Sequence, residues 1–411
     1  MSKKIIFTTF IVLVILAVSL FGYYFILNNE NPNNGGIVDN IRNFLPFGGD
    51  SYTPEIPTEN ENSNNENQNE SNTENQIDFT KKLRKISSEP VSGAGILDTQ
   101  AGGVVRYIEK ATGHVYEVEL FSPKASRISN TTIPLSYDAV WGNGNSSFVA
   151  RYLAEDNNTV ETYAMTIKNI STSTTSTLQG IEFPVNIVDI SAFGTNFFYL
   201  QKTTNGSSGV VSGFDGTKKK EVWSSPMKEF NSQFINNQTV LLNTKPLENV
   251  AGYLYSINTS NATVKKVLGP KLGLSSLANS DLSKVIFLTQ ANQIFLSNLD
   301  TKTNTENELF PTTFPEKCVW STKDKTIVYC AVPKENLNTT SLSAWYKGSV
   351  TFSDEIWKYY TTDNTSEMVM ELGKEAGENI DVIKPTLSTS EQYLVFTNKK
   401  DNSLWSLDLT Q

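Results

Sequence analysis

The sequence predicts an all-β fold, a seven-bladed β-propeller, placed behind a single N-terminal transmembrane helix and a disordered linker. Three features of the 411-residue chain lead to this prediction. The chain opens with a long uncharged apolar run, continues with a polar stretch, and then alternates two β-rich signals seven times. The repeating part, residues 81–411, is too long for one ordinary hydrophobic core, which favours a repeat architecture.

The apolar run covers residues 5–27, has the sequence IIFTTFIVLVILAVSLFGYYFIL and carries no charge. As a helix it is long enough to cross a hydrocarbon core of about 30 Å. A cleavable signal peptide has a shorter apolar stretch, with polar residues after its cleavage site. Here Leu20, Phe21 and two tyrosines follow the small residues Ala17 and Ser19. We therefore expect residues 5–27 to remain as a membrane anchor.

The charges on either side of this run predict its orientation. Lys3 and Lys4 precede the run, whereas the first charges beyond it, Glu30 and Asp39, are acidic. The positive-inside rule places residues 1–4 in the cytoplasm and the C-terminal domain outside it. The expected location is therefore the cell membrane, with a single span and an extracytoplasmic domain.

An Asn- and Glu-rich segment, residues 28–80, follows the anchor and holds ten acidic residues against one basic residue. Such a composition cannot bury enough apolar area to offset the entropy of ordering, so it predicts a disordered linker. Within it, residues 37–47 place apolar side chains at helical spacing. This stretch is either a short amphipathic helix that lies on the membrane or on a partner, or a slightly apolar part of the linker.

The two β-rich signals set the fold of residues 81–411. One is a pair of short runs around a tight turn, as in AVWGNGNSSFVARYL, and the other is a strand with a large central residue, as in DEIWKYYTTDN. The turns are centred near residues 100, 143, 194, 237, 282, 324 and 390, and the strand markers are Tyr116, Tyr163, Val211, Tyr255, Phe295, Trp357 and Trp405. A period mostly in the forties with about four strands per unit is typical of a propeller blade, whereas a β-sandwich would not repeat in register.

The segment WSTKDKTIVY, residues 320–329, carries the clearest copy of the repeat. It resembles the core of the WD40-like, TolB-type propeller repeat: Trp320, Ser321 and Asp324 fit, although the Pro-Asp-Gly turn of that repeat is not intact. The layout of anchor, Asn-rich linker and propeller is similar to membrane-anchored propeller proteins of reduced-genome bacteria. This resemblance implies a fold and a location rather than an activity.

The two ends of the repeat region predict how the ring closes. The last unit ends after LWSLDLT without a fourth strand, and residues 80–91 precede the first complete unit. We expect this N-terminal segment to supply the missing outer strand, since a closed ring leaves no blade with an incomplete, exposed edge.

The only two cysteines, Cys318 and Cys330, lie on either side of the turn around Asp324. Their equal distances from the turn predict cross-strand neighbours, with Cα atoms about 4.5–5.5 Å apart, within reach of a disulfide. Outside the cytoplasm an oxidised pair is expected, with two free thiols as the alternative. The sequence offers neither a C-x-x-C redox pair nor enough partners for a zinc site.

Motifs for chemistry are scarce. His114 is the only histidine, and no G-x-S-x-G nucleophile motif, phosphate-binding G-x-x-x-x-G-K-[ST] loop or calcium loop is present. The sequence therefore predicts no catalytic residue, cofactor or metal ligand. The net charge of residues 81–411 is −2, since residues 1–27 carry +2 and the linker carries −9 of the total of −9. A nearly neutral domain argues against nucleic-acid binding.

One long loop interrupts the repeat, the 21-residue segment KENLNTTSLSAWYKGSVTFSD between the second and third strands of blade six. Long irregular loops on a rigid scaffold often carry function. Trp345 and Tyr346, beside Lys347 and near Asp354, are candidates to stack on a sugar ring or to contact a partner protein. The alternative is that these aromatic side chains fold back and cover the blade, with Asp354 as a turn residue.

Three functions are consistent with these features. We favour a non-enzymatic, membrane-anchored propeller that binds an envelope protein or a surface glycan. The second is a propeller-type polysaccharide hydrolase or lyase. Two acidic side chains facing each other at the channel mouth would favour it, and an apolar or Asn-lined mouth would exclude it. The third is a structural spacer.

Overall fold

The computed structural model describes residues 81–122, 125–154, 156, 158–168, 177–185, 187–290, 293–339 and 342–410. The predicted N-terminus (1–4), anchor (5–27) and linker (28–80, with the stretch 37–47) lie outside the described residues. Within the described part of the chain, no helix is long and apolar enough to cross a membrane.

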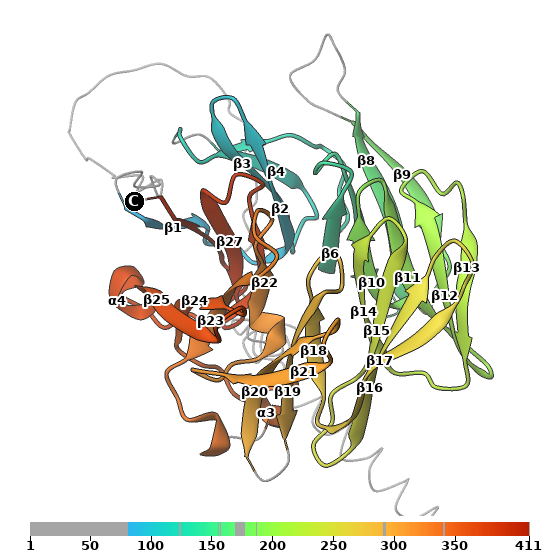
Figure 1. Cartoon of the computed structure of the whole chain (residues 1–411). Coiled ribbons are helices and arrows are strands. Elements are labelled where there is room, and N and C mark those ends of the chain that lie inside the picture. The colour runs from blue at the N-terminus through green and yellow to red at the C-terminus, as the bar shows by residue number, and fades with distance from the viewer. Residues whose placement is uncertain are drawn as a thin grey trace, which may run out of the picture. The chain divides into compact units, whose positions relative to one another are not determined.

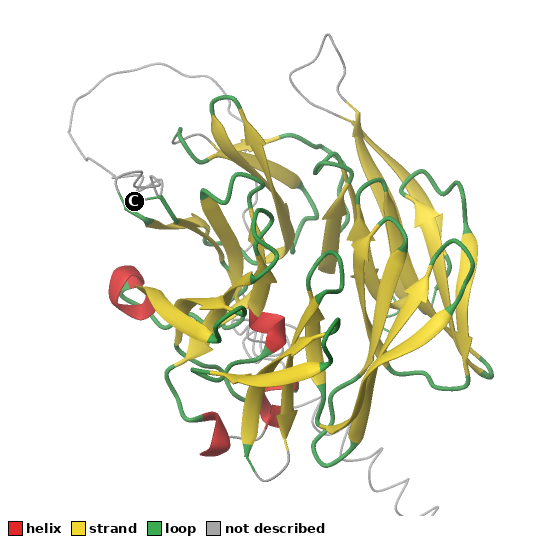
Figure 2. Cartoon of the chain, in the orientation of Figure 1, coloured by secondary structure: helices red, strands yellow, loops and turns green. Residues whose placement is uncertain are grey.

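The described chain forms seven four-stranded antiparallel sheets, the blades of a propeller (Figure 1, Figure 2). The strands of each blade are given from the innermost outwards. Blade 1 is β2 Val91–Thr99, β3 Gly102–Glu109, β4 Val115–Glu119 and β5 Ala125–Arg127, and blade 2 is β6 Ser136–Gly142, β7 Ser147–Leu153, β8 Val160–Lys168 and β9 Thr177–Phe183. Blade 3 is β10 Ile187–Phe193, β11 Asn196–Thr203, β12 Gly206–Gly213 and β13 Lys220–Ser225. The all-β seven-bladed fold is confirmed.

Blades 4 to 6 follow the same order. Blade 4 is β14 Phe230–Asn236, β15 Thr239–Thr244, β16 Ala251–Asn258 and β17 Val264–Leu272. Blade 5 is β18 Ser275–Ala278, β19 Lys284–Gln290, β20 Ile294–Asp300 and β21 Thr305–Leu309. Blade 6 is β22 Cys318–Trp320, β23 Ile327–Pro333, β24 Asp354–Tyr360 and β25 Thr365–Glu371. Blade 7 is β26 Val382–Leu387, β27 Tyr393–Asn398, β28 Leu404–Asp408 and β1 Leu83–Ser87. Each predicted tight turn joins the first two strands of a blade, and each strand marker lies in a third strand.

Strand β1 closes the ring, as the ends of the repeat region predict. It pairs antiparallel with β28, with Leu83 opposite Leu407 and Arg84 opposite Ser406. In Figure 1 the blue β1 lies at the edge of the red C-terminal blade. The innermost strands of blades 7 and 1, β26 and β2, are also in contact. The first and last parts of the described chain therefore share one blade.

The hydrophobic core is divided among the junctions between neighbouring blades. Strands buried on both sides carry long apolar runs, such as Phe197 to Leu200 in β11, each at most 3 % exposed. Seven clusters of buried side chains each join two neighbouring blades, including one that joins blade 7 to blade 1 through Tyr393 and Val105. The repeat region thus builds a ring of small cores, each shared by two blades.

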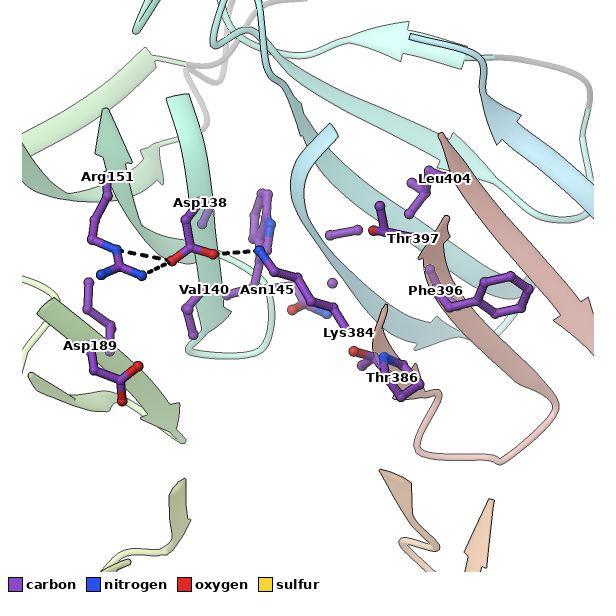
Figure 3. Close-up of a pocket in the computed structure, with 17 residues that line it drawn as sticks. Asp138, Val140, Asn145, Arg151, Asp189, Lys384, Thr386, Phe396, Thr397 and Leu404 are labelled. Atoms are coloured by element: carbon purple, nitrogen blue, oxygen red, sulfur yellow. Dashed lines mark hydrogen bonds and ion pairs between the residues drawn. The ribbon is translucent and has the colours of Figure 1, made fainter. Parts of the chain in front are cut away.

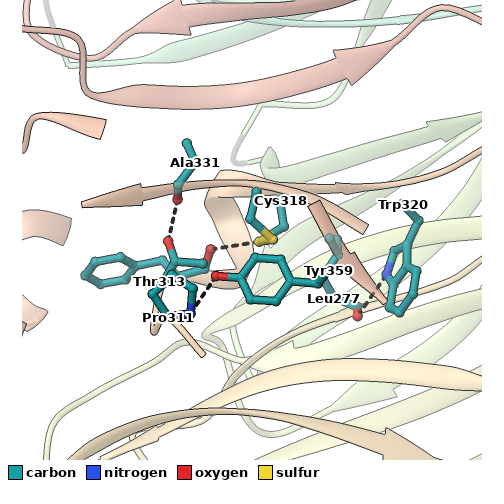
Figure 4. The surroundings of a disulfide bond; sticks show 9 residues. Leu277, Pro311, Thr313, Cys318, Trp320, Ala331 and Tyr359 are labelled. Carbon is teal, nitrogen blue, oxygen red and sulfur yellow. Dashed lines mark hydrogen bonds between the residues drawn. A yellow bond between two sulfur atoms is a disulfide. The ribbon is translucent and has the colours of Figure 1, made fainter. Parts of the chain in front are cut away.

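The cysteines form a disulfide, which confirms the oxidised alternative (Figure 4). Cys318 lies directly opposite Cys330 in the β22–β23 pair, and the two Cα atoms are 4.0 Å apart, closer than the distance of about 4.5–5.5 Å expected from the sequence. The bond is buried between blades 5 and 6. Nearby, the Trp320 indole donates a hydrogen bond of 3.2 Å to the carbonyl oxygen of Leu277, which ties the two blades together.

Short helices lie in the connections rather than in the blades. They are η1 Pro315–Lys317, η2 Leu337–Thr339, α3 Leu342–Tyr346 and α4 Leu372–Ala376. Of these, η2 and α3 belong to the predicted long loop, which we call the blade-six insertion (residues 334–353). The insertion does lie between the second and third strands of that blade.

Candidate ligand-binding channel

A cavity of about 380 Å³ lies between the innermost strands of blades 7, 1, 2 and 3, and we call it the channel pocket (Figure 3). Its walls are formed by Ala94, Gly95, Asp138, Ala139, Val140, Trp141, Asn145, Arg151, Asp189, Ile190, Lys384, Pro385, Thr386, Val395, Phe396, Thr397 and Leu404. The volume lies within the range of about 300–1,000 Å³ that is typical of small-molecule sites, and the walls mix apolar side chains with a few charges.

Three of the charged residues occupy equivalent places in different blades. Asp138, Asp189 and Lys384 are each the third residue of the innermost strand of their blade, in β6, β10 and β26. Each lies beside a β-bulge, where the pairing with the second strand shifts. A bulge turns a strand and redirects its side chains, and bulges are frequent next to functional sites.

The backbone at Lys384 is in the left-handed region, with φ of 52°. This conformation is uncommon for a residue other than glycine and costs free energy of roughly 1–3 kcal/mol. It lies inside the bulge of β26. The result is that the Lys384 ammonium reaches across blade 1, where it donates a hydrogen bond of 2.9 Å to the carbonyl oxygen of Ser92, and continues to blade 2.

In blade 2 the ammonium meets a carboxylate that already has a basic partner (Figure 3). Lys384 Nζ lies 2.5 Å from Asp138 Oδ1, and Arg151 donates to Asp138 Oδ2 from Nε at 3.1 Å and from Nη2 at 2.6 Å. Asp138 and Arg151 lie directly opposite each other in the β6–β7 pair, which explains why their side chains meet. One carboxylate thus serves two cations.

Asp189, in the next blade, has different surroundings. Its Oδ2 accepts a hydrogen bond of 2.5 Å from the backbone N–H of Ser232. Among the residues that the structure describes, no basic side chain lies within ion-pair distance of this carboxylate, although Arg151 is close enough for its charge to act on it. Asp189 is therefore a carboxyl group in the wall of the channel pocket that no cation of the described chain contacts directly.

The pKa values of the two aspartates move in opposite directions. Burial raises the pKa of Asp138, but the charges of Lys384 and Arg151 outweigh that effect and hold it well below its ordinary value. Burial raises the pKa of Asp189 to about 6, against the hydrogen bonds from Ser232. Near neutral pH, Asp138 is fully ionised and Asp189 is close to its titration range.

The remaining walls are fixed by hydrogen bonds to blade 1. Trp141 Nε1 donates to the carbonyl oxygen of Gly93 at 3.2 Å, and Asn145 Nδ2 donates to that of Ile96 at 2.5 Å. Gly95 makes the second contact possible, because a Cβ atom there would lie 2.2 Å from Asn145 Oδ1. The polar side chains of the pocket are thus held in place before any ligand binds.

A smaller cavity of about 160 Å³ lies between the inner strands of blades 4, 5 and 6. Ser232, the hydrogen-bond partner of Asp189, lines it, so one hydrogen bond links the walls of the two cavities. Its charged wall residue is Glu316, whose Oε1 accepts hydrogen bonds from Ser275 at 2.6 Å and Tyr346 at 2.8 Å, while Oε2 is buried without a partner among the described residues. Burial raises the pKa of Glu316.

The blade-six insertion packs over this part of the ring. Trp345 is only 3 % exposed, and its ring stacks on Phe314 with centroids 4.5 Å apart. Its indole donates to the carboxylate of Asp381 at 3.1 Å. Tyr346 and Lys347 are exposed. A ligand contact from this loop, which stays a prediction, therefore falls to Tyr346 and Lys347, whereas Trp345 fastens the insertion to the propeller.

Asp354 is the first residue of β24 and is completely buried. Lys317 Nζ lies 2.5 Å from both Asp354 Oδ2 and Asp381 Oδ1, and all three side chains are inaccessible to solvent. Asp354 Oδ2 also accepts a hydrogen bond of 2.6 Å from the backbone N–H of Val382. This buried ion cluster connects blades 6 and 7, and it lies in the protein interior rather than in the channel pocket.

The structure thus brings together a set of residues that the sequence alone did not indicate, namely Asp138, Arg151, Asp189 and Lys384. A signal for three of them exists in the repeats, because a charged residue stands at the third position of the first strand in YDAVW, VDISAF and IKPTL. This shared position becomes visible when the blades are aligned with one another and the bulges are taken into account.

Metal ligands are not gathered in the described residues, where no group of three or more His, Cys, Asp and Glu side chains is arranged to hold an ion. His114 lies in the turn between β3 and β4, and its Nε2 is 3.4 Å from the Thr132 hydroxyl. It is outside the channel pocket.

No model of a known protein family matches the chain, and no curated protein matches it. Among solved structures, an oligogalacturonate lyase from Vibrio parahaemolyticus is similar over 82 % of this chain and 94 % of its own, with a TM-score of 0.53 and 7 % identity. TolB from Acinetobacter baumannii is similar over 77 % of this chain and 63 % of its own, with a TM-score of 0.40 and 9 % identity. At such low identity, the likeness to the first of these structures shows a shared β-propeller fold.

Proposed function

We propose that this chain is a membrane-anchored, extracytoplasmic β-propeller that binds a protein or glycan ligand of the cell envelope, with the channel pocket as its binding site. The observation that carries this proposal is the Lys384–Asp138–Arg151 cluster with Asp189 in the same cavity. A cavity whose charged groups are held in place by bulges and by fixed hydrogen bonds is typical of a preformed ligand site.

The experiment that tests binding uses the full-length chain in detergent to capture material from solubilised envelope of the organism that encodes it. We expect the parent to retain a ligand that the double variant Asp189→Asn, Lys384→Gln loses. Lys325→Gln is the matched control, because Lys325 forms an exposed ion pair with Asp281, outside the channel pocket. Equal retention by all three proteins would place the binding site elsewhere, and a Tyr346→Ala, Lys347→Ala variant then tests the blade-six insertion.

The proposed location rests on the uncharged run of residues 5–27 and the lysines before it. Its test compares the full chain with a variant that lacks residues 5–27, by membrane fractionation and by protease treatment of intact cells. We expect the parent in the membrane fraction, with its propeller cleaved from outside. A propeller that protease reaches only after the cells are lysed would refute the orientation.

A polysaccharide hydrolase or lyase is the second candidate. It is favoured by the presence of Asp138 and Asp189 in one cavity with pKa values displaced in opposite directions, a pattern found where one carboxyl group donates a proton and the other stays ionised. The oligogalacturonate lyase of similar fold makes polygalacturonate a reasonable first substrate.

In this second function Asp189 would donate the proton and Asp138 would remain ionised. The test measures the release of reducing ends or unsaturated products from polygalacturonate and from envelope glycans. Activity that Asp189→Asn abolishes, while Lys325→Gln keeps it, would establish the enzyme. Retention of an unaltered ligand by the parent protein would favour binding alone.

A further inference from the structure

The channel pocket has a positive side and a negative side. On the positive side, Lys384 and Arg151 share the single carboxylate of Asp138, which leaves one excess positive charge. Lys110 is near this excess charge: burial lowers the pKa of Lys110, and the positive charge of Lys384 lowers it further. On the negative side, Asp189 meets hydrogen bonds from Ser232 but no ion-pair partner within the described chain. The pocket is therefore dipolar.

Donors and acceptors remain for a ligand at both ends. An ammonium group has three N–H bonds, and Lys384 uses one on Ser92 and one on Asp138. Arg151 has five, and it directs two at Asp138. Asp189 accepts hydrogen bonds from Ser232, and no basic side chain of the described residues pairs with it, so its negative charge remains for a ligand. All three side chains line the same cavity of about 380 Å³.

We propose that the channel pocket recognises a zwitterion, a short peptide that carries a primary ammonium group and a carboxylate. The ammonium group lies against Asp189 and the carboxylate against Lys384 and Arg151. This inference rests on the proposed function and names its ligand class. The volume of the cavity accommodates a ligand of dipeptide size.

The charges argue against ligands of one sign. A simple anion would meet Lys384 and Arg151 but would bring a second negative charge into the cavity beside Asp189. A simple amine would satisfy Asp189 and leave the excess positive charge of the opposite side without a partner. Burying a charge without an opposite partner costs more than the contact at the other end returns. A neutral ligand with separated charges satisfies both sides.

The test uses the full-length protein and four dipeptides, alanylalanine, lysylalanine, glutamylalanine and phenylalanylalanine, each in three forms. The free form is zwitterionic at its ends, the N-acetylated form lacks the ammonium group, and the C-amidated form lacks the carboxylate. Isothermal titration calorimetry measures each affinity. We expect at least one free dipeptide to bind roughly tenfold or more tightly than both of its blocked forms, the usual value of one charge-assisted hydrogen bond.

Two variants assign the ends of the ligand. Asp189→Asn is expected to remove the preference for the free form over the N-acetylated form, and Lys384→Gln is expected to remove the preference over the C-amidated form. Lys325→Gln is expected to keep both preferences. Circular dichroism checks that each variant is folded, and the comparison of the three dipeptide forms on the parent protein decides the matter even if a variant fails to fold.

The proposal is overturned if no free dipeptide binds with a Kd below about 10 mM, or if every dipeptide that binds has a blocked form that binds as tightly as its free form. These outcomes differ from failure of the proposed function. Capture of an envelope ligand that depends on Asp189 and Lys384, without dipeptide binding, would retain the binding function and reject the zwitterion.

Discussion

Asp138 and Asp189 stand at the same position of two neighbouring blades, yet their surroundings give them different acid strengths. Asp138 has Arg151 opposite it in the sheet and Lys384 from blade 7. Asp189 instead pairs with the apolar Leu200 of β11. The ionisation of an aspartate at this position therefore depends on the residues that face it from the neighbouring strands and blades.

At the same scale, the buried cluster of Lys317, Asp354 and Asp381 predicts a dependence of stability on pH. Burial raises the pKa of Asp354 to about 6, above the value of about 4 expected for an unfolded chain, and the single lysine that offsets this effect is shared with Asp381. A group with a raised pKa contributes stability at acidic pH, and that stability is lost as the pH rises through about 6.

We therefore expect the free energy of unfolding of Asp354→Asn, relative to that of the parent at the same pH, to be higher at pH 7.5 than at pH 5. The expected increase is roughly 1–2 kcal/mol. Asparagine keeps an acceptor for Lys317 and removes the excess negative charge, while Asp381 still balances the lysine. Urea unfolding at both pH values measures the difference. A parent and variant that lose stability in parallel between pH 5 and 7.5 would contradict it.

At the scale of elements, the blade-six insertion combines a buried and an exposed aromatic residue side by side. Trp345 packs in a cluster with Leu288, Phe314 and Phe352, while the Tyr346 hydroxyl donates to Glu316. The backbone N–H of Ser343 also donates to a carboxylate oxygen of Glu248 in blade 4, at 3.0 Å. The insertion is thus attached at several points to the ring beneath it.

Replacement of the two aromatic residues should separate packing from surface contact. We expect Trp345→Ala to lower the free energy of unfolding by about 3–5 kcal/mol, because it leaves a cavity and removes a hydrogen bond to Asp381. Tyr346→Ala is expected to cost about 1 kcal/mol, chiefly through the hydrogen bond to Glu316. Urea unfolding of the purified proteins measures both. Equal losses for the two variants would show that the insertion is not fastened through Trp345.

The disulfide acts on one hairpin, β22 with β23. Because Cys318 and Cys330 are twelve positions apart, we expect Cys318→Ala, Cys330→Ala to lower the free energy of unfolding by about 3 kcal/mol on the entropic model. Urea unfolding measures this loss, and the control is the parent protein unfolded in the presence of a reductant, which should match the variant. A stability equal to that of the oxidised parent would mean that the hairpin needs no covalent bond.

These elements show what the sequence could predict and what it could not. The turns, the strand markers, the closing strand and the Cys318–Cys330 pair depend on spacing along the chain, and all are found as predicted. The channel pocket depends on residues that are far apart in sequence and meet only when the ring closes, as Lys384 meets Asp138. Similarly, an aromatic pair in a polar loop fits exposure or burial equally well. Trp345 is buried because residues from other parts of the chain, such as Leu288 and Phe314, pack around it.

At the scale of the whole molecule, stability depends on closure, because each blade shares its core with two neighbours. We expect deletion of residues 81–88 to remove β1, expose the edge of β28 and open the packing of Leu83 with Trp405 and Leu407. The deletion should lower the melting temperature of the entire propeller and promote self-association through the free edge. Calorimetry and size-exclusion chromatography measure the two effects, and an unchanged monomer would contradict this view.

The pairing of β1 with β28 also has a consequence for the order of events during synthesis. The ribosome produces β1 before every other strand of the propeller and β28 after all of them, so the earliest strand has no partner until β28 has been synthesised. Blades 1 to 6 can assemble in sequence as the chain emerges, since each contains only consecutive strands. Blade 7 cannot assemble in this way, because it combines the first strand, β1, with the last three, β26 to β28. The junctions between blade 7 and its two neighbours must therefore form last. We therefore expect the ring to close in a late step, in which the two ends of the described propeller meet.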